Sequence, residues 1–244
     1  MMNTWDLICF DLDDTLIDYE RTFQAAIHHC FTTFFGQQFD FSSWFITFKQ
    51  CCDRYWNDYA CRRLTRTEYR RLRFLETMSV YNRKADHQMA DAFQDYFDQV
   101  VGRFSVPVDG LIPLLHWLRN RSVPLGVITN GTGRIQREKL YYAGLHPFFS
   151  DEAIIISEEV GMKKPDRAIF SYAKQQLAPH CDQPLFIGDS WELDVVGALR
   201  ANWQAVYFNP RQNAPTTFHQ PVAVCNNVNE LLVLLREPPD EGKG

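Results

Sequence analysis

Six short apolar runs, each ending in a polar or glycine-containing turn, constrain the fold of this chain more than any other feature. Continuous apolar runs are typical of strands that are covered on both faces, as in a parallel sheet. We expect the last run to form an edge strand. The predicted strands span residues 5–10, 124–128, 153–156, 184–187, 204–208 and 222–225.

Helical patterns lie between these strands. Leucines recur at helical spacing over residues 111–118, and a segment over residues 132–143 closes at Gly144, a common residue after a helix end. Three more predicted helices span residues 166–177, 193–201 and 228–236. Strands that alternate with helices predict an α/β fold, here a Rossmann-like open parallel sheet with helices on both faces.

Residues 18–104 break this alternation. Gly36 and Gly102 are the only glycines in this segment and it holds no proline, whereas Phe, Tyr, Arg and Gln are frequent. We interpret the segment as a helical insertion between the first strand and the rest of the sheet. The predicted domains are therefore an α/β core of residues 1–17 and 105–244 and a helical domain of residues 18–104.

The composition argues against several classes of protein. A net charge of −5 disfavours a binder of nucleic-acid polymers, which normally has a basic surplus. Seven cysteines without a CxxC pair indicate a reduced compartment. The acidic start is unlike a signal peptide, and no apolar stretch is long enough to span a bilayer. We expect a cytoplasmic protein without membrane partners, a monomer or weak dimer.

Two carboxylates stand at the end of the first predicted strand. Asp11 and Asp13 follow directly after the apolar residues 7–10. Carboxylates beside a buried strand are costly to bury without a partner. A cation together with an anionic substrate would provide that partner.

Three further polar segments follow predicted strands. In an open α/β sheet the carboxyl ends of the strands line the ligand crevice, so these segments are expected to meet the Asp11/Asp13 pair. A helix that begins near Thr132 would also offer free N–H groups that suit a phosphate. The segments are Thr129-Asn130-Gly131, Lys163-Lys164-Pro165, and Gly188-Asp189 with Asp194.

Each segment by itself has a structural explanation. Asp-x-Asp-x-Thr and Gly-Asp occur in ordinary turns, and a Lys-Lys-Pro bend is usually an exposed surface feature. Four such segments at successive strand ends are hard to explain by structure alone, and their agreement favours a functional site.

The four segments resemble the motifs of the haloacid-dehalogenase-like hydrolase superfamily, in its phosphatase branch. The matching residues are Asp11-Leu12-Asp13-Asp14-Thr15, Thr129, Lys164, and Gly188-Asp189 with Asp194. The insertion is similar to the helical cap that follows the first motif in such enzymes. Residues 128–131 and 156–161, followed by Lys164-Pro165, resemble the YjjG-type pyrimidine 5'-nucleotidase subgroup.

This resemblance implies a Mg²⁺-dependent phosphatase with assigned residue roles. Asp11 would be the nucleophile and form an aspartyl-phosphate, and Asp13 would be the general acid and base. Thr129, Asn130, Gly131 and Lys164 would bind the phosphoryl group. Mg²⁺ would be held by Asp11, the backbone carbonyl of Asp13, and Asp189, with Asp194 outside the ligand set.

The substrate implied by the resemblance is a small phosphorylated metabolite, with nucleoside 5'-monophosphates favoured. The cap would supply most substrate contacts, with Arg73 and the rings of Trp56 and Tyr59 as candidates, although packing between cap helices is the commoner role of such rings. The alternatives within the superfamily are a phosphosugar or flavin mononucleotide phosphatase, a phosphosugar mutase and, fitting less well, a 2-haloacid dehalogenase. A non-catalytic binding protein would not need all four motifs.

Overall fold

The computed structural model describes residues 5–36, 38 and 40–237. The chain divides into two compact units, Met1–Glu20 with Ser105–Gly244 and Arg21–Phe104. Compactness does not establish a functional domain, so the core and cap domains of residues 1–17 with 105–244 and 18–104 stay a prediction.

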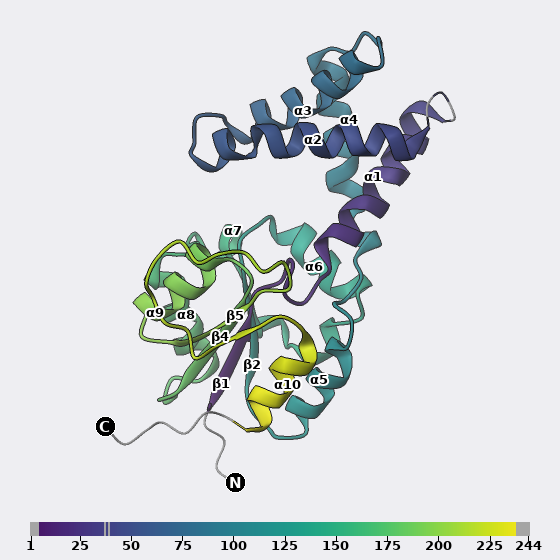
Figure 1. The fold of residues 1–244 in the computed structure, drawn as a ribbon. Helices are drawn as coiled ribbons and strands as arrows, with labels where there is room; N and C mark the ends of the chain where they lie inside the picture. Colours follow the sequence, from purple (N-terminus) through teal and green to yellow (C-terminus); the bar gives the residue numbers. More distant parts are fainter. Residues whose placement is uncertain (1–4, 37, 39, 238–244) are drawn as a thin grey trace. The chain divides into compact units, whose positions relative to one another are not determined.

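The first unit is built on a parallel sheet in the order β3-β2-β1-β4-β5-β6. Figure 1 labels its four middle strands. All six predicted strands are present, and β6 lies at one edge as expected. The bounds are β1 (Leu7–Phe10), β2 (Leu125–Thr129), β3 (Ile154–Ile156), β4 (Pro184–Gly188), β5 (Gln204–Phe208) and β6 (Ala223–Cys225).

Helices lie between and after these strands, as predicted. They are α5 (Leu111–Arg119), α6 (Gly133–Tyr142), α8 (Arg167–Leu177) and α10 (Val228–Arg236). A further short helix, α7 (Ser157–Val160), was not predicted. The single helix predicted over residues 193–201 is wrong in detail. The chain there forms a π-helical turn, η4 (Trp191–Val196), and then α9 (Gly197–Arg200).

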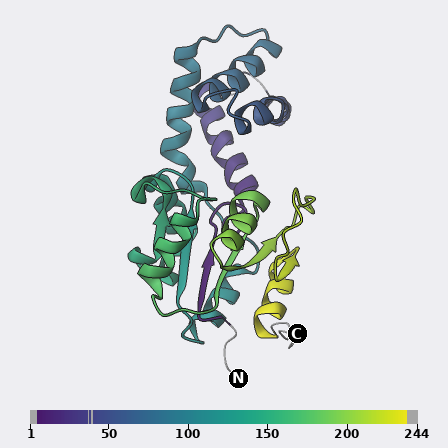
Figure 2. The ribbon, with the colours of Figure 1, turned by 90° about the vertical axis from the view of Figure 1, so that its left-hand side faces the viewer.

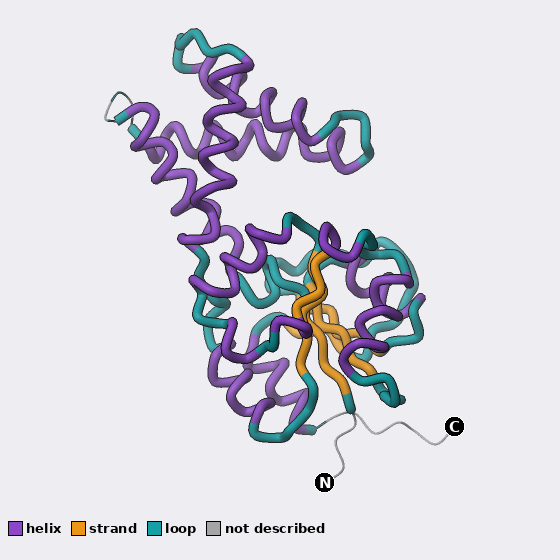
Figure 3. Tube along the Cα trace, turned by 180° about the vertical axis from the view of Figure 1, so that it is seen from behind, coloured by secondary structure: helices purple, strands orange, loops and turns teal. Residues whose placement is uncertain are grey.

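Alternate strand residues feed two hydrophobic cores, one on each face of the sheet. Ile8 and Phe10 of β1 join the core under α5, α6 and α10. Leu7 and Cys9 join the opposite core under α8, η4 and α9. Successive side chains of a strand point to opposite faces, so a continuously apolar strand serves both cores. Figures 2 and 3 show the sheet between its helical layers. The predicted fold class is confirmed.

Strand β1 lies at the centre of the sheet and pairs with β2 on one side and β4 on the other. The chain therefore leaves β1 toward one half of the sheet and later returns to build the other half. Such a reversal of strand order opens a crevice at the carboxyl ends of the strands. The polar segments that follow β1, β2 and β4 all lie at this crevice.

The second unit is helical, as the shortage of glycine and proline predicted. Helix α1 (Tyr19–Phe35) leads into it, followed by α2 (Phe41–Ala60), α3 (Arg66–Val80) and α4 (His87–Val100). Acceptor side chains cap three of these helices, and Thr65 with Glu68 forms a capping box at α3. Aromatic rings fill the interior, with Trp44 stacked on Phe48 at 5.0 Å between centroids.

No helix within the described ranges is both long enough and apolar enough to cross a bilayer.

Candidate active site

The chain turns sharply after β1 and presents its acidic residues at the sheet edge. Asp11 N–H donates to Ile187 O at 2.9 Å, which continues the pairing of β1 with β4 by one residue. Asp14 then adopts a left-handed conformation (φ 59°), and its N–H donates to Ile17 O at 2.7 Å. The tight turn holds the carboxylates of Asp11 and Asp13 at the carboxyl end of the central strand.

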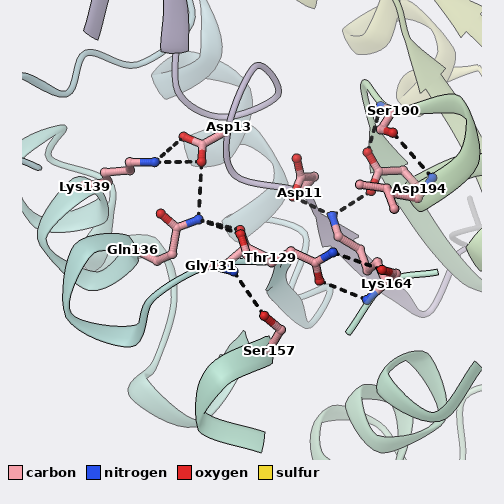
Figure 4. A network of polar contacts seen from close by, with 12 residues as sticks. Asp11, Asp13, Thr129, Gly131, Gln136, Lys139, Ser157, Lys164, Ser190 and Asp194 are labelled. Carbon is pink, nitrogen blue, oxygen red and sulfur yellow. Dashed lines mark hydrogen bonds and ion pairs between the residues drawn. The ribbon is translucent and has the colours of Figure 1, made fainter. Parts of the chain in front are cut away.

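Lys164 joins two of the predicted segments. Its Nζ lies 2.5 Å from Asp11 Oδ1 and 2.6 Å from Asp194 Oδ1 (Figure 4). The lysine is 3% exposed, and burial alone would lower its pKa. The two carboxylates outweigh burial and raise the pKa of Lys164, so it stays an ammonium. A buried fixed cation beside Asp11 suits an incoming phosphoryl group.

Local backbone structure brings Asp194 to this lysine. The π-helical turn η4 carries it, and Ser190 N–H donates to Asp194 Oδ2 at 2.8 Å. Gly188 makes room, since a β-carbon there would lie 2.5 Å from Asp194 Cγ. Asp194 therefore contacts Lys164 directly, and π-helical turns of this kind are frequent at functional sites.

The segment after β2 is fixed by its own side chains. Asn130 Oδ1 accepts from Lys164 N–H at 2.9 Å, and Asn130 Nδ2 donates to Lys164 O at 3.0 Å. Gly131 N–H donates to Ser157 Oγ at 3.1 Å, and Gly133 N–H, at the start of α6, donates to Glu158 Oε2 at 2.7 Å. The amides of Gly131 and Gly133 are thus engaged within the protein.

Asp189 belongs to a group of three carboxylates that could hold a cation. It can approach Asp11 and Asp194 with one oxygen from each residue within 4.8 Å of the others. No described residue donates a hydrogen bond to its side chain. Burial raises the pKa of Asp189 to about 8, and repulsion from Asp11 and Asp194 adds to the effect. Carboxylate oxygens are the ligands that Mg²⁺ prefers, so these residues fit that ion.

Burial also raises the pKa of Asp11, with the carboxylate of Asp194 adding to the rise and Lys164 opposing it. Asp11 and Asp189 thus share a site with more negative charge than Lys164 neutralises. Carboxyl groups with pKa values perturbed in this way cluster at functional sites.

Two functional candidates were missed by the sequence analysis. Lys139 Nζ lies 2.7 Å from both carboxylate oxygens of Asp13, and Gln136 Nε2 lies 3.3 Å from Asp13 Oδ2 (Figure 4). Gln136 Nε2 also donates to Thr129 Oγ1 at 2.8 Å. Both side chains come from α6 and are three positions apart, a spacing that puts them on one helix face. The sequence held no signal for them, since lysine and glutamine in a helix are usually surface residues.

Other residues considered from the sequence occupy less central positions. Asp14 pairs with Arg211 at 2.8 Å, and burial raises the pKa of Asp14 although Arg211 opposes this. Glu192 is exposed and accepts from Thr216. Trp56 is exposed to 53%, so it is not enclosed between helices.

Arg73 belongs to the second unit and is 7% exposed. It donates to Gln94 Oε1 at 2.6 Å and lies 5.1 Å from the ring centroid of Tyr69 and 5.2 Å from that of Phe48. Arg73 is therefore a buried cation held against aromatic rings, unlike Arg71 on the same helix, which pairs with Asp91 nearer the surface.

Comparisons with known proteins agree with this geometry. The pyrimidine 5'-nucleotidase YjjG of Escherichia coli is 28% identical over 243 residues, 95% of this chain and 98% of its own. The pyrimidine 5'-nucleotidase PynA of Streptococcus pneumoniae is 27% identical over 93% of this chain and 94% of its own. The magnesium-bound crystal structure of the HAD-hydrolase YfnB from Bacillus subtilis superposes with a TM-score of 0.79 at 25% identity, covering 95% of this chain and 98% of that one.

A family model described as haloacid dehalogenase-like hydrolase matches residues 5–202, which include all four motif segments and the helical insertion. This match confirms the resemblance and the prediction that the protein is a hydrolase. The chain belongs to the haloacid dehalogenase-like hydrolases.

Proposed function

We propose that this protein is a Mg²⁺-dependent phosphomonoester hydrolase that works through an aspartyl-phosphate on Asp11. The observation that carries the proposal is the position of Lys164, buried between Asp11 and Asp194 with Asp189 beside them. This combination offers a nucleophile, a fixed cation and a cation-binding carboxylate at one point. A phosphoryl transfer that proceeds through an aspartyl-phosphate uses all three elements.

In the first step a carboxylate oxygen of Asp11 forms a bond to phosphorus as the bond from phosphorus to the leaving oxygen breaks. Asp13 gives its proton to that oxygen, and the alcohol departs. In the second step Asp13 takes a proton from water, the water oxygen bonds to phosphorus, and the bond to Asp11 breaks. Inorganic phosphate leaves, and both aspartates return to their starting states.

Lys164 and Thr129 would bind the phosphoryl oxygens. Lys164 is held by Asp194 and by the two backbone contacts of Asn130, so its ammonium group does not reorganise during the reaction. Thr129 Oγ1 accepts from Gln136, which leaves its own hydroxyl proton free to donate. Gly131 would shape the loop here, since its φ of 157° is rare for other residues.

We assign Mg²⁺ binding to Asp11, Asp189 and the backbone carbonyl of Asp13. Asp194 is not assigned to the ion, because it pairs with Lys164. When bound, this ion supplies positive charge that stabilises the transferring phosphoryl group. The raised pKa of Asp189 supports the assignment, since burial and the neighbouring carboxylates of Asp11 and Asp194 outweigh the attraction of Lys164.

The substrate class we propose is nucleoside 5'-monophosphates. Support comes from YjjG and PynA, named pyrimidine 5'-nucleotidases, which match over 95% and 93% of this chain. These matches run through the helical insertion, which we propose acts as the cap and selects the substrate, with Arg73 as a binding residue. The crystal structure of YfnB bound to magnesium supports the choice of ion.

A phosphate-release screen tests the proposal. Purified protein is given nucleoside 5'-monophosphates, sugar phosphates and flavin mononucleotide, each with Mg²⁺ and after exhaustive chelation. We expect Mg²⁺-dependent release that is highest with the nucleotides, and no release from Asp11→Asn at unchanged thermal stability. Equal turnover by wild type and Asp11→Asn would remove Asp11 as the nucleophile. Isomer formation without phosphate release would favour a mutase.

A further inference from the structure

We propose that Gln136 and Lys139 of α6 are positioning residues that hold the Asp13 side chain at the place from which, once it has taken up a proton from solvent, it protonates the leaving group. The proposal rests on the proposed function, because it assigns these side chains a part in the same reaction. Neither residue lies in the four motif segments.

The contact between Lys139 and Asp13 is close and two-fold. Lys139 Nζ is 2.7 Å from both carboxylate oxygens, and the lysine side chain is 5% exposed against 31% for Asp13. A buried ammonium group is costly unless it is paired, so Lys139 is committed to Asp13. The ring of Tyr19, 5.0 Å from Nζ, covers it further.

The other two cations of α6 pair with glutamates. Arg134 pairs with Glu138 on the same helix, and Arg137 pairs with Glu159 of α7. Both arginines are partly exposed, whereas Lys139 is buried. The contact with Asp13 is therefore specific to Lys139 and does not come from a general basic face of α6.

Gln136 links Asp13 to the phosphate-binding segment. Its Nε2 lies 2.8 Å from Thr129 Oγ1 and 3.3 Å from Asp13 Oδ2, and Figure 4 shows it between the two. Gln136 is 2% exposed. One amide thus sets the distance between the hydroxyl that would bind the phosphoryl group and the carboxylate that would protonate the leaving oxygen.

Helix α6 is itself well anchored. Glu158 bonds to Gly133 N–H at its first turn, Arg137 makes a two-point contact with Glu159, and Leu140 is buried in the core. A rigid helix that carries Gln136 and Lys139 one turn apart gives Asp13 a fixed reference. Precise placement of an acid relative to the reacting atoms is a recognised source of rate enhancement.

Leaving-group dependence tests this proposal. Protonation by Asp13 is essential for an alkoxide leaving group, such as the 5'-oxygen of a nucleoside monophosphate, and is nearly dispensable for p-nitrophenolate. We therefore compare kcat/KM for the best alkyl phosphate of the screen and for p-nitrophenyl phosphate. The variants are Lys139→Met, Lys139→Arg and Gln136→Met, with Arg134→Met as the matched loss of a cation from the same helix.

We expect Lys139→Met to lower kcat/KM for the alkyl phosphate by about 10²-fold, the lower range for general acid catalysis, and to lower it far less for p-nitrophenyl phosphate. Lys139→Arg should restore most of the loss, and Gln136→Met should show the same substrate bias more weakly. Arg134→Met should leave both values unchanged. An equal loss on both substrates would overturn the proposal.

A double-mutant cycle decides whether Lys139 acts through Asp13. In an Asp13→Asn background, Lys139→Met should cause no further loss on the alkyl phosphate; a full additional loss would contradict the inference. Thermal unfolding checks that each variant folds, and Gln136→Met carries the test if Lys139→Met does not. Wild-type protein without phosphatase activity, or an active Asp11→Asn, would instead reject the proposed function.

Discussion

Asn130 and Lys164 hold each other by a reciprocal pair of hydrogen bonds, although they lie 34 positions apart in the sequence. The side-chain amide of Asn130 accepts from the backbone N–H of Lys164 and donates to its backbone carbonyl. This pair joins the segment after β2 to the segment that carries the buried ammonium group. The position of Lys164 therefore depends on the side chain of Asn130.

We predict that Asn130→Ala lowers kcat/KM by about 10²-fold, because a small shift of a catalytic cation is costly. The expected loss of unfolding free energy is about 1–3 kcal/mol, the cost of leaving buried backbone groups without partners. Steady-state kinetics and chemical denaturation measure the two effects separately.

Asn209 provides a matched control. Its side chain bonds in the same two-point manner to the backbone of Asn213, at 2.9 and 3.0 Å, in the loop after β5. Asn209→Ala should lose a similar amount of stability and much less activity. If both variants lost activity equally, the brace on Lys164 would have no special role.

Most of the fold was predictable, because the physical signals are local. Continuous apolar strands such as residues 7–10 can only be buried on both faces, and alternation with helices then leaves few topologies. The motif segments were predictable for a related reason. A parallel sheet gathers the carboxyl ends of its strands, so Asp11, Thr129 and Asp189 had to meet at one edge.

The contacts of Asp13 were not predictable in the same way. Lys139 and Gln136 lie within a helix, where lysine and glutamine are ordinary surface residues. Only the packing of α6 turns them inward. The π-helical turn that brings Asp194 onto Lys164 was likewise interpreted as part of one regular helix, because its extra residue per turn leaves no clear periodic signal.

The raised pKa of Asp189 predicts how the metal-free protein responds to pH. A carboxyl with a pKa of about 8 in the folded state and about 4 when unfolded binds its proton more tightly in the folded protein. Its stabilising contribution is full below pH 4 and is lost as the pH rises through 8. We expect the Tm in chelator to fall between pH 5.5 and 8.5.

Asp189→Asn is the control for this pH response, since an amide does not titrate. The variant should show a smaller fall of Tm over the same pH range. Mg²⁺ should raise the wild-type Tm more at pH 8.5 than at pH 5.5, because the ion competes with protons for the site, and should have little effect on the variant. A wild-type Tm that follows the variant at every pH would contradict the assignment of Asp189.

A substitution at Gly188 is expected to disturb Lys164 through Asp194. A methyl group at this position would overlap the carboxylate of Asp194, so Gly188→Ala should displace Asp194 and deprive Lys164 of one partner. We expect a stability loss of about 1–3 kcal/mol, typical of overpacking, together with a large loss of kcat. Gly126→Ala is the comparison: its methyl group would meet the apolar Leu177 and Cys9, so it should lose stability without a matching loss of kcat per folded molecule.

Arg73 gives the last prediction, which concerns substrate choice. Arg73→Met keeps the apolar contacts with the neighbouring rings but removes the charge and the hydrogen bond to Gln94. If Arg73 binds substrate, the variant should change relative kcat/KM values across the phosphate panel by about 10-fold, one charge-assisted contact, with unchanged Mg²⁺ dependence. Arg71→Met, which removes a surface ion pair from the same helix, should leave the order of substrates intact. An unchanged order in Arg73→Met would make Arg73 a structural residue of the helical unit, because its only measurable effect would then be on stability.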